Sequence, residues 1–414
     1  MNNQAFKAAL FINYFVFAIL LNSVGIVILK SQNVYGVDEV AASTLELFKD
    51  MPIAIVSFLV ASFLPRIGYK KAMLFSLGLV TLACLGMYFG NSFWWAKALF
   101  AAVGASFALI KVSVYASIGL VTANQQEHNA LMSNIEGVFM FGIALAYFLF
   151  PAFNTGSDPD SWLRVYWVLA GLSALSFVFL WRAPFALTAV ASSDSAGLGE
   201  DFAAMFRLLV KPLVLVFVAS AFLFVMIEQG IMTWLPTFND RVLALPENLA
   251  IMMASILAVS LGVGRIAAGV LTRYISWFWV LLGCLAAAMA MVYWVLPMAV
   301  ASKIDGVTTL SDIPLLGYAF PIVGLFIAPI YPLLNSVVLS ALPKHSHSAM
   351  SGLIIIFSAV GGTLGSRLIG LLFKHVGASE AFSYTLLPMA LLPISHENSV
   401  LIRMIGIKKK MIWK

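Results

Sequence analysis

Residues 44–71 read TLELFKDMPIAIVSFLVASFLPRIGYKK, an apolar stretch with Glu46, Lys49 and Asp50 near its start and a short basic segment at its end. About 20 mainly apolar residues are enough to cross the hydrocarbon layer as a helix. Lys and Arg concentrate in short loops on the cytoplasmic side of a membrane. The stretch therefore predicts a membrane-spanning helix that ends in the cytoplasm and carries three charges that lipid alone would not tolerate.

The composition extends this prediction to the whole chain. Of the 414 residues, 62% are hydrophobic and only 10% are charged, whereas soluble globular chains carry about 25% charged residues. This excludes a soluble enzyme, and we expect no catalytic activity. We predict an all-α membrane protein with twelve transmembrane helices, at residues 8–29, 41–65, 72–90, 97–121, 131–153, 163–181, 212–236, 248–272, 277–297, 314–341, 349–373 and 381–394.

Basic residues in the predicted loops set the orientation. Fourteen Lys and Arg fall in segments on the side of the N-terminus and six fall on the other side. Because the basic excess marks the cytoplasmic side, we expect both termini in the cytoplasm and a multi-pass protein of the cell inner (plasma) membrane. The excess reports topology, so we expect no nucleic-acid partner.

The chain divides into two halves that echo each other. A polar, Gly- and Ser-rich segment that includes SSDSAGLGED at 192–201 predicts a cytoplasmic linker over 183–210. It separates an N-terminal six-helix half, 1–182, from a C-terminal half, 211–414, which ends in a short or truncated helix and a basic tail. FLPRIG at 63–68 parallels VLTRYI at 270–275, and ALMSN at 130–134 parallels SAMSG at 348–352. A duplicated six-helix unit explains both matches.

Two basic segments, PRIGYKK at 65–71 and GRIAAGVLTR at 264–273, resemble those of the major facilitator superfamily. EQGIMTWLPTF at 228–238, GLFIAPIYPLLNS at 324–336 and SGLIIIFSAVGGTLGS at 351–366 loosely resemble its sugar-porter-like branch, which includes fucose–proton symporters. The resemblance implies two pseudo-symmetric six-helix halves around a central cavity, with spans three, six, nine and twelve on the outside. Pro65 stands where the family usually has an acid, and the first span offers only Asn13 and Asn22 where fucose symporters have an acid.

Eight charged residues fall inside the predicted spans. A charge at mid-bilayer costs about 2.5–3.5 kcal/mol, so these side chains must face one another or a water-filled cavity. None falls in spans three, six, nine or twelve. The eight are Glu46, Lys49, Asp50, Lys111, Glu136, Glu228, Arg265 and Arg367.

Their depths along the spans predict two ion-pair gates between the halves. Glu46 and Asp50 share a helix face in the outer part of span two, at a depth similar to that of Arg367 in span eleven. Glu136 and Arg265 both lie near the inner ends of their spans. An alternative remains, in which each charge is satisfied statically within its own half or by backbone carbonyl groups.

The remaining charges and polar groups supply candidates for solute binding and proton coupling. Lys111 lies near mid-depth, with Tyr115 one turn away, and either binds solute or neutralises the acids of span two. Glu228 is the first candidate for proton coupling, because a low-dielectric cavity favours the neutral form of a carboxyl group; the alternative is a structural acid. Asp50, Glu46 and Glu136 are further candidates for proton coupling. Gln229, Trp234, Asn22 and Asn335 complete the solute-binding candidates, although Trp234 could instead be an interfacial anchor.

The resemblance and the buried charges together predict a secondary active transporter that works by alternating access. We expect proton-coupled uptake of a small polar or anionic solute, namely a sugar, a sugar derivative or an organic acid. The alternative is drug or metabolite efflux by proton antiport, although GVFMFGIALAYFLFP at 137–151 lacks the Gly-Pro signature of such antiporters. The expected partners are the lipid bilayer, a small-molecule solute and protons, and we expect a monomer. All five histidines lie in predicted loops or the tail, so we expect no metal and no cofactor.

Overall fold

The structure is a computed structural model that describes residues 4–122, 125–155, 158–183, 205, 207–301, 307–342 and 347–397. These residues contain helices and no strand. In the first half of the chain the helices are α1 (Gln4–Asn22), α2 (Val24–Tyr35), α3 (Glu39–Ala42), α4 (Thr44–Ile67), α5 (Tyr69–Gly90), α6 (Phe93–Val121), α7 (Gln125–Phe153), η1 (Ser161–Arg164) and α8 (Val165–Arg182).

The second half begins with three long elements: α10 (Pro212–Arg241), α11 (Glu247–Leu271) and α12 (Trp277–Ala290). The elements that follow are shorter, apart from α17. They are η2 (Met291–Val295), α13 (Leu296–Ala301), η3 (Leu310–Asp312), α14 (Leu315–Ala319), η4 (Phe320–Ile322), α15 (Val323–Ile327), α16 (Ile330–Ala341), α17 (His347–His375), α18 (Ala378–Ala381), η6 (Phe382–Thr385) and α19 (Leu386–Glu397).

Within the described residues, nine helical segments are long and apolar enough to cross a membrane, and the bent pair α1 and α2 makes a tenth. The other two predicted spans correspond to α4 and to the segment from α18 to α19. The first carries three charged residues in its opening two turns, and the second is divided into short pieces. The prediction of an all-α membrane protein is confirmed, and the helix order is consistent with twelve spans.

The first span is broken where the sequence predicted one uninterrupted helix. α1 ends at Asn22, and α2 begins at Val24 with a bend of 42°. Asn22 Nδ2 donates to the carbonyl of Ala18 at 2.8 Å, and Ser23 Oγ donates to the carbonyl of Leu20 at 2.8 Å. Such bonds from side chain to backbone compete with the helical ladder and bend helices. Asn22 therefore lies at a bend, where its side chain reaches the interior.

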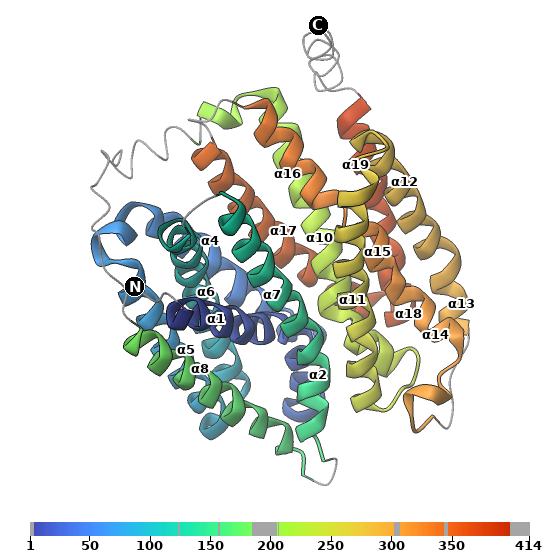
Figure 1. Cartoon of the computed structure of the whole chain (residues 1–414). Helices are drawn as coiled ribbons and strands as arrows, with labels where there is room; N and C mark the ends of the chain where they lie inside the picture. The colour runs from blue at the N-terminus through green and yellow to red at the C-terminus, as the bar shows by residue number, and fades with distance from the viewer. Residues whose placement is uncertain are drawn as a thin grey trace, which may run out of the picture.

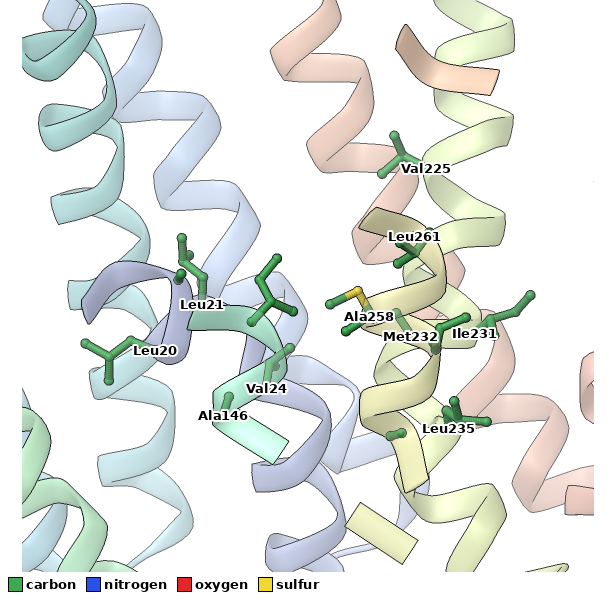
Figure 2. Close-up of a cluster of buried hydrophobic side chains, with 14 of the residues drawn as sticks. Leu20, Leu21, Val24, Ala146, Val225, Ile231, Met232, Leu235, Ala258 and Leu261 are labelled. Atoms are coloured by element: carbon green, nitrogen blue, oxygen red, sulfur yellow. The ribbon is translucent and has the colours of Figure 1, made fainter. Parts of the chain in front are cut away.

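The described helices form two groups, with α1 to α8 toward the lower left of Figure 1 and α10 to α19 toward the upper right. The groups meet where α7 packs against α11, α4 against α17 and α2 against α10. Figure 2 shows apolar side chains on both sides of this boundary, among them Leu21 and Ala146 in one group and Met232 and Leu261 in the other. Most of the predicted linker, 183–210, and the basic tail after residue 397 lie outside the described residues. The division into two domains therefore stays a prediction.

Large aromatic side chains cover the outside of several helices. Phe89 on α5, Trp181 on α8 and Trp279 on α12 are 63–71% exposed. Lipid can solvate such surfaces, since the bilayer core is itself apolar. Five charged side chains of the spanning helices lie instead around a cavity between the two groups of helices.

Candidate functional site

A cavity of about 260 Å³ lies between the two groups of helices. Four helices of the first group line it, α1, α4, α6 and α7, together with α10 and α11 of the second. Nine of the sixteen lining residues are apolar, five are charged and two are neutral amides. The lining consists of Leu21, Asn22, Lys49, Asp50, Ile53, Phe107, Lys111, Phe139, Met140, Ile143, Glu228, Gln229, Met232, Ala258, Leu261 and Arg265.

An ion cluster on α4 forms one wall of the cavity. Lys49 pairs with Glu46, and its Nζ lies 3.5 Å from Asp50 Oδ1. The three side chains are at most 10% exposed, and the Glu46 carboxylate is fully buried. One cation therefore serves two carboxylates, which leaves one negative charge in excess within the cluster.

Glycines allow neighbouring helices to approach this cluster closely. A Cβ atom at Gly362 of α17 would lie 2.8 Å from Asp50 Oδ2, and a Cβ atom at Gly104 of α6 would collide with the carbonyl of Lys49. Any larger residue at either position would push the helices apart. Asp50 thus lies both on the cavity wall and against a helix of the opposite group.

A second ion pair lies on the other side of the cavity. Arg265 Nη2 on α11 is 3.3 Å from Glu228 Oε1 on α10. Arg265 Nη1 lies 4.0 Å from the sulfur of Met140 on α7, and its Nε is buried without a hydrogen-bond partner among the described residues. The guanidinium therefore neutralises Glu228 and still has N–H groups to offer.

Lys111 on α6 is a cation without a carboxylate partner within 4 Å in the described part of the chain. It is exposed and lines the cavity. Its Nζ lies 5.8 Å from the ring centre of Phe107 and 6.0 Å from that of Tyr115, which is within reach of a cation–π interaction. Among the three cations that line the cavity, Lys111 is therefore the one that lies against aromatic side chains and not against a carboxylate.

Tyr115 and Glu136 form a pair behind the cavity wall. The Tyr115 hydroxyl donates to Glu136 Oε1 at 2.6 Å. Tyr115 also packs against Tyr14 of α1, with ring centres 6.3 Å apart. Neither Tyr115 nor Glu136 lines the cavity, although Tyr115 supports Lys111 from the side.

Of the other four solute-binding candidates, two line the cavity and two do not. Asn22 and Gln229 line the cavity. Trp234 is fully buried between α10 and α17, where its Nε1 donates to the carbonyl of Ser366 at 2.9 Å and its ring lies 5.1 Å from that of Phe373. Asn335 on α16 lies outside the lining.

The sequence of this chain matches a known family of membrane proteins. The family model of the Major Facilitator Superfamily matches residues 8–366. This chain belongs to the Major Facilitator Superfamily. The superfamily's proteins are membrane transporters, so the chain has the fold of a multi-pass membrane transporter. A comparison with curated proteins finds no relative that matches it.

Solved structures of other superfamily members have the same fold. The nucleoside transporter NupG aligns with a TM-score of 0.71 at 13% identity, over 96% of this chain and 100% of that one. A D-xylose–proton symporter aligns with a TM-score of 0.70 at 12% identity, over 95% and 97%. A bacterial homologue of the human lysosomal transporter Spinster, inward-facing and occupied, aligns with a TM-score of 0.67 at 14% identity, over 95% of each chain. At these identities the likeness shows the fold alone.

The charges that were predicted to form the two ion-pair gates have other partners in this structure. Arg367 crosses to the first group, where it donates to the carbonyl of Val40 and, at 3.2 Å, to Ser43 Oγ, not to Glu46 or Asp50. Arg265 pairs with Glu228 rather than Glu136. The structure records one conformation of a transporter, so both gates stay predictions for another conformation.

A polar cluster between the two groups of helices, which we call the Glu247 cluster, was not predicted from the sequence. Glu247 at the start of α11 pairs with Lys30 of α2 and accepts hydrogen bonds from Asn33 at 2.8 Å and Asn154 at 3.0 Å. Two further ion pairs cross at the same end, Arg241 with Glu39 and Lys374 with Asp38, the latter at 2.7 Å. Lys30, Arg241 and Lys374 were predicted only as loop charges that report orientation. Opposite charges at the ends of successive predicted spans were a usable signal for these pairs.

Proposed function

We propose that this protein takes up a small polar or anionic solute together with protons, by alternating access across the cell inner membrane. The observation that carries the proposal is the cluster of Lys49 with Glu46 and Asp50. It holds one carboxylate in excess, and it borders both the solute cavity and the opposite half of the molecule.

The orientation supports uptake from the outside. The excess of basic residues on one side favours an orientation with both termini in the cytoplasm. The Glu247 cluster, at the end of α2 and the start of α11, is then extracellular and closes the outer side. Opening toward the outside would separate Glu247 from Lys30, Asn33 and Asn154.

Asp50 is the acid best placed to carry the proton. Glu228 has Arg265 as its own partner, and Glu46 is the closer partner of Lys49, whereas Asp50 lies 3.5 Å from a lysine already engaged. Protonation of Asp50 removes the excess negative charge and leaves Lys49 with Glu46 as a neutral pair. A neutral ion cluster at the contact between the two groups of helices has a smaller desolvation penalty than a charged one when the groups move.

The charged groups around Asp50 come from several helices. Lys49 and Glu46 lie on its own helix, while Lys111 of α6, Glu228 of α10 and Arg265 of α11 line the same cavity. On α17, Arg367 bonds to Val40 and Ser43 five residues beyond Gly362. Of these groups, Asp50 is the carboxylate without a cation of its own, so a proton would neutralise it.

The structural neighbours support the solute class only by analogy. One is a nucleoside transporter and another a proton symporter for D-xylose, both of them carriers of small polar solutes. The alternative, efflux by proton antiport, is favoured by the apolar side chains among the cavity lining. The direction of proton and solute movement separates the two proposals.

The test is uptake into proteoliposomes with radiolabelled glucose, glucuronate, lactate and mandelate, with and without an inward proton gradient. We expect at least one solute to accumulate only with the gradient. Asp50→Asn should abolish accumulation and retain exchange of that solute across the membrane. Gradient-independent entry of every transported solute would refute proton coupling, and expulsion of solute under the same gradient would establish antiport.

A further inference from the structure

We infer that the solute is an amphipathic monoanion whose anionic group binds between Lys111 and Arg265, while its apolar part contacts the aromatic wall of the cavity. This inference rests on the proposed uptake function and narrows its solute class from polar or anionic to organic anions. Four observations on the described residues support it.

Lys111 supplies the first observation. Its ammonium group faces the cavity without a carboxylate within 4 Å among the described residues, whereas Lys49 and Arg265 both have one. The Phe107 and Tyr115 rings beside it carry no charge. An anionic solute would supply a direct counter-charge inside the cavity.

Arg265 supplies the second observation. A guanidinium carries five N–H donors in a planar fork, and Glu228 accepts a hydrogen bond at 3.3 Å from only one of its nitrogens. Nε is buried without a partner among the described residues, and Nη1 has only the weak acceptor Met140. Nη1 and the second N–H group of Nη2 can still donate to an anion, and hydrogen bonds between a guanidinium and a carboxylate are among the strong ones.

The neutral polar groups of the cavity supply the third observation. Only Asn22 and Gln229 are neutral hydrogen-bonding side chains among the sixteen that line it, and Asn22 Nδ2 already donates to the carbonyl of Ala18. A neutral sugar brings several hydroxyl groups, each of which costs about 1–3 kcal/mol if it is buried without a partner. The lining therefore suits a solute with one strongly polar end better than one that is polar all round.

The apolar wall supplies the fourth observation. Phe107, Phe139, Met140 and Ile143 lie on α6 and α7, and Met232 on α10 and Leu261 on α11 line the same cavity. They offer an aromatic or aliphatic solute body contacts that exclude water. A second negative charge on the solute would instead approach Asp50 or Glu228, so a monoanion fits better than a dianion.

The test compares ligands that differ in charge but hardly in shape. Thermal unfolding of the purified full-length protein is followed with mandelate, its neutral amide mandelamide, lactate, glucuronate, the dianion phenylmalonate and glucose. We expect a monocarboxylate, mandelate foremost, to raise the unfolding temperature, and mandelamide, phenylmalonate and glucose to leave it unchanged. In Lys111→Gln the apparent affinity for that monocarboxylate should fall at least tenfold, and Lys111→Arg should recover part of it.

Lys97 offers a matched control on the same helix. Its Nζ also lies over aromatic rings, 4.6 Å from the centre of Phe93 and 4.9 Å from that of Trp94, but outside the cavity. Lys97→Gln should leave the affinity unchanged. The unfolding temperature of each variant without ligand shows whether it is folded.

Three results would overturn the anion site: equal stabilisation by mandelamide, unchanged affinity in a folded Lys111→Gln variant, or no shift with any monocarboxylate. Gradient-driven accumulation of glucose alone would overturn the anion site and leave proton-coupled uptake standing. If mandelate binds through Lys111 but its uptake does not depend on the proton gradient, the anion site stands and proton-coupled uptake is overturned.

Discussion

The Thr233 hydroxyl on α10 donates a hydrogen bond to the Glu46 carboxylate on α4, with Oγ1 and Oε2 3.3 Å apart. The bond crosses from one group of helices to the other inside the protein. Thr233 is five residues beyond Glu228 on the same helix, and Glu46 shares Lys49 with Asp50. The bond therefore connects the α4 ion cluster to the helix that carries the acid on the opposite side of the cavity.

Thr233→Val should weaken this connection. The substitution keeps the shape of the side chain but removes a donor to a fully buried carboxylate, at a cost of about 1–3 kcal/mol. We expect a lower unfolding temperature and slower transport. Thr237→Val is the control one turn along, since the buried Thr237 hydroxyl has no hydrogen-bond partner among the described residues. Equal effects of the two variants would show that the bond to Glu46 is unimportant.

Glu247→Gln should open the outer end. Lys30 is 3% exposed and would lose its carboxylate, and breaking a buried ion pair in this way costs about 3–5 kcal/mol. Spin labels at Asp160→Cys and Ser379→Cys, in a chain with Cys84 and Cys284 replaced by Ala, report the distance between the halves. We expect a larger population of long distances.

The control for this measurement is Asp312→Asn. Asp312 lies in another loop and accepts hydrogen bonds from Thr308 and Thr309 within its own half. Its replacement should leave the distance distribution unchanged. A distribution equally unchanged by Glu247→Gln would show that the Glu247 cluster does not hold this end closed.

The outer contact of Asp38 should not respond to pH in the physiological range. Asp38 lies before α3, where the hydrogen bond from Lys374 and then the backbone N–H of Ala41 hold the pKa of its carboxyl below the ordinary value. A lowered pKa means that this contact stabilises the fold above about pH 4 and is lost as pH falls through the lowered value. Asp38→Asn should therefore leave the shape of the transport profile between pH 5 and 8 unchanged, whereas Asp50→Asn should flatten it. A flattened profile in Asp38→Asn would move the proton site to the outer end.

Trp234→Phe should affect stability and not solute choice. The substitution removes the indole N–H that bonds to the Ser366 carbonyl in the interior, at a cost of about 1–3 kcal/mol of unfolding free energy. The ranking of mandelate, lactate, glucuronate and glucose in uptake should stay the same. A changed ranking in a variant of normal stability would return Trp234 to the solute site.

Hydropathy and charge were enough to predict the class of fold and the collection of charges between the halves. Three of the solute-binding candidates, Lys111, Asn22 and Gln229, lie on the cavity wall. Depth along a span follows from residue number at about 1.5 Å per residue. The number of a residue therefore indicates which membrane level it occupies.

The ion-pair partner of each charge could not be predicted from the sequence, because it depends on how the helices rotate and bend. Arg265 and Glu136 were predicted to share a depth, but in the structure the guanidinium pairs with Glu228 of the neighbouring helix. Trp234 resembled a cavity or interface residue, but it faces α17. The break after Asn22 depends on local hydrogen bonds from side chain to backbone, which no average over a window of residues detects.

The most direct test of the central claim measures proton entry and solute entry in the same proteoliposomes, with a pH-sensitive dye inside and radiolabelled mandelate outside. The account predicts that the wild-type protein acidifies the lumen only when solute is added. In Asp50→Asn solute should equilibrate without acidification. Solute entry into wild-type vesicles with no change in lumenal pH, or undiminished acidification by Asp50→Asn, would contradict the account.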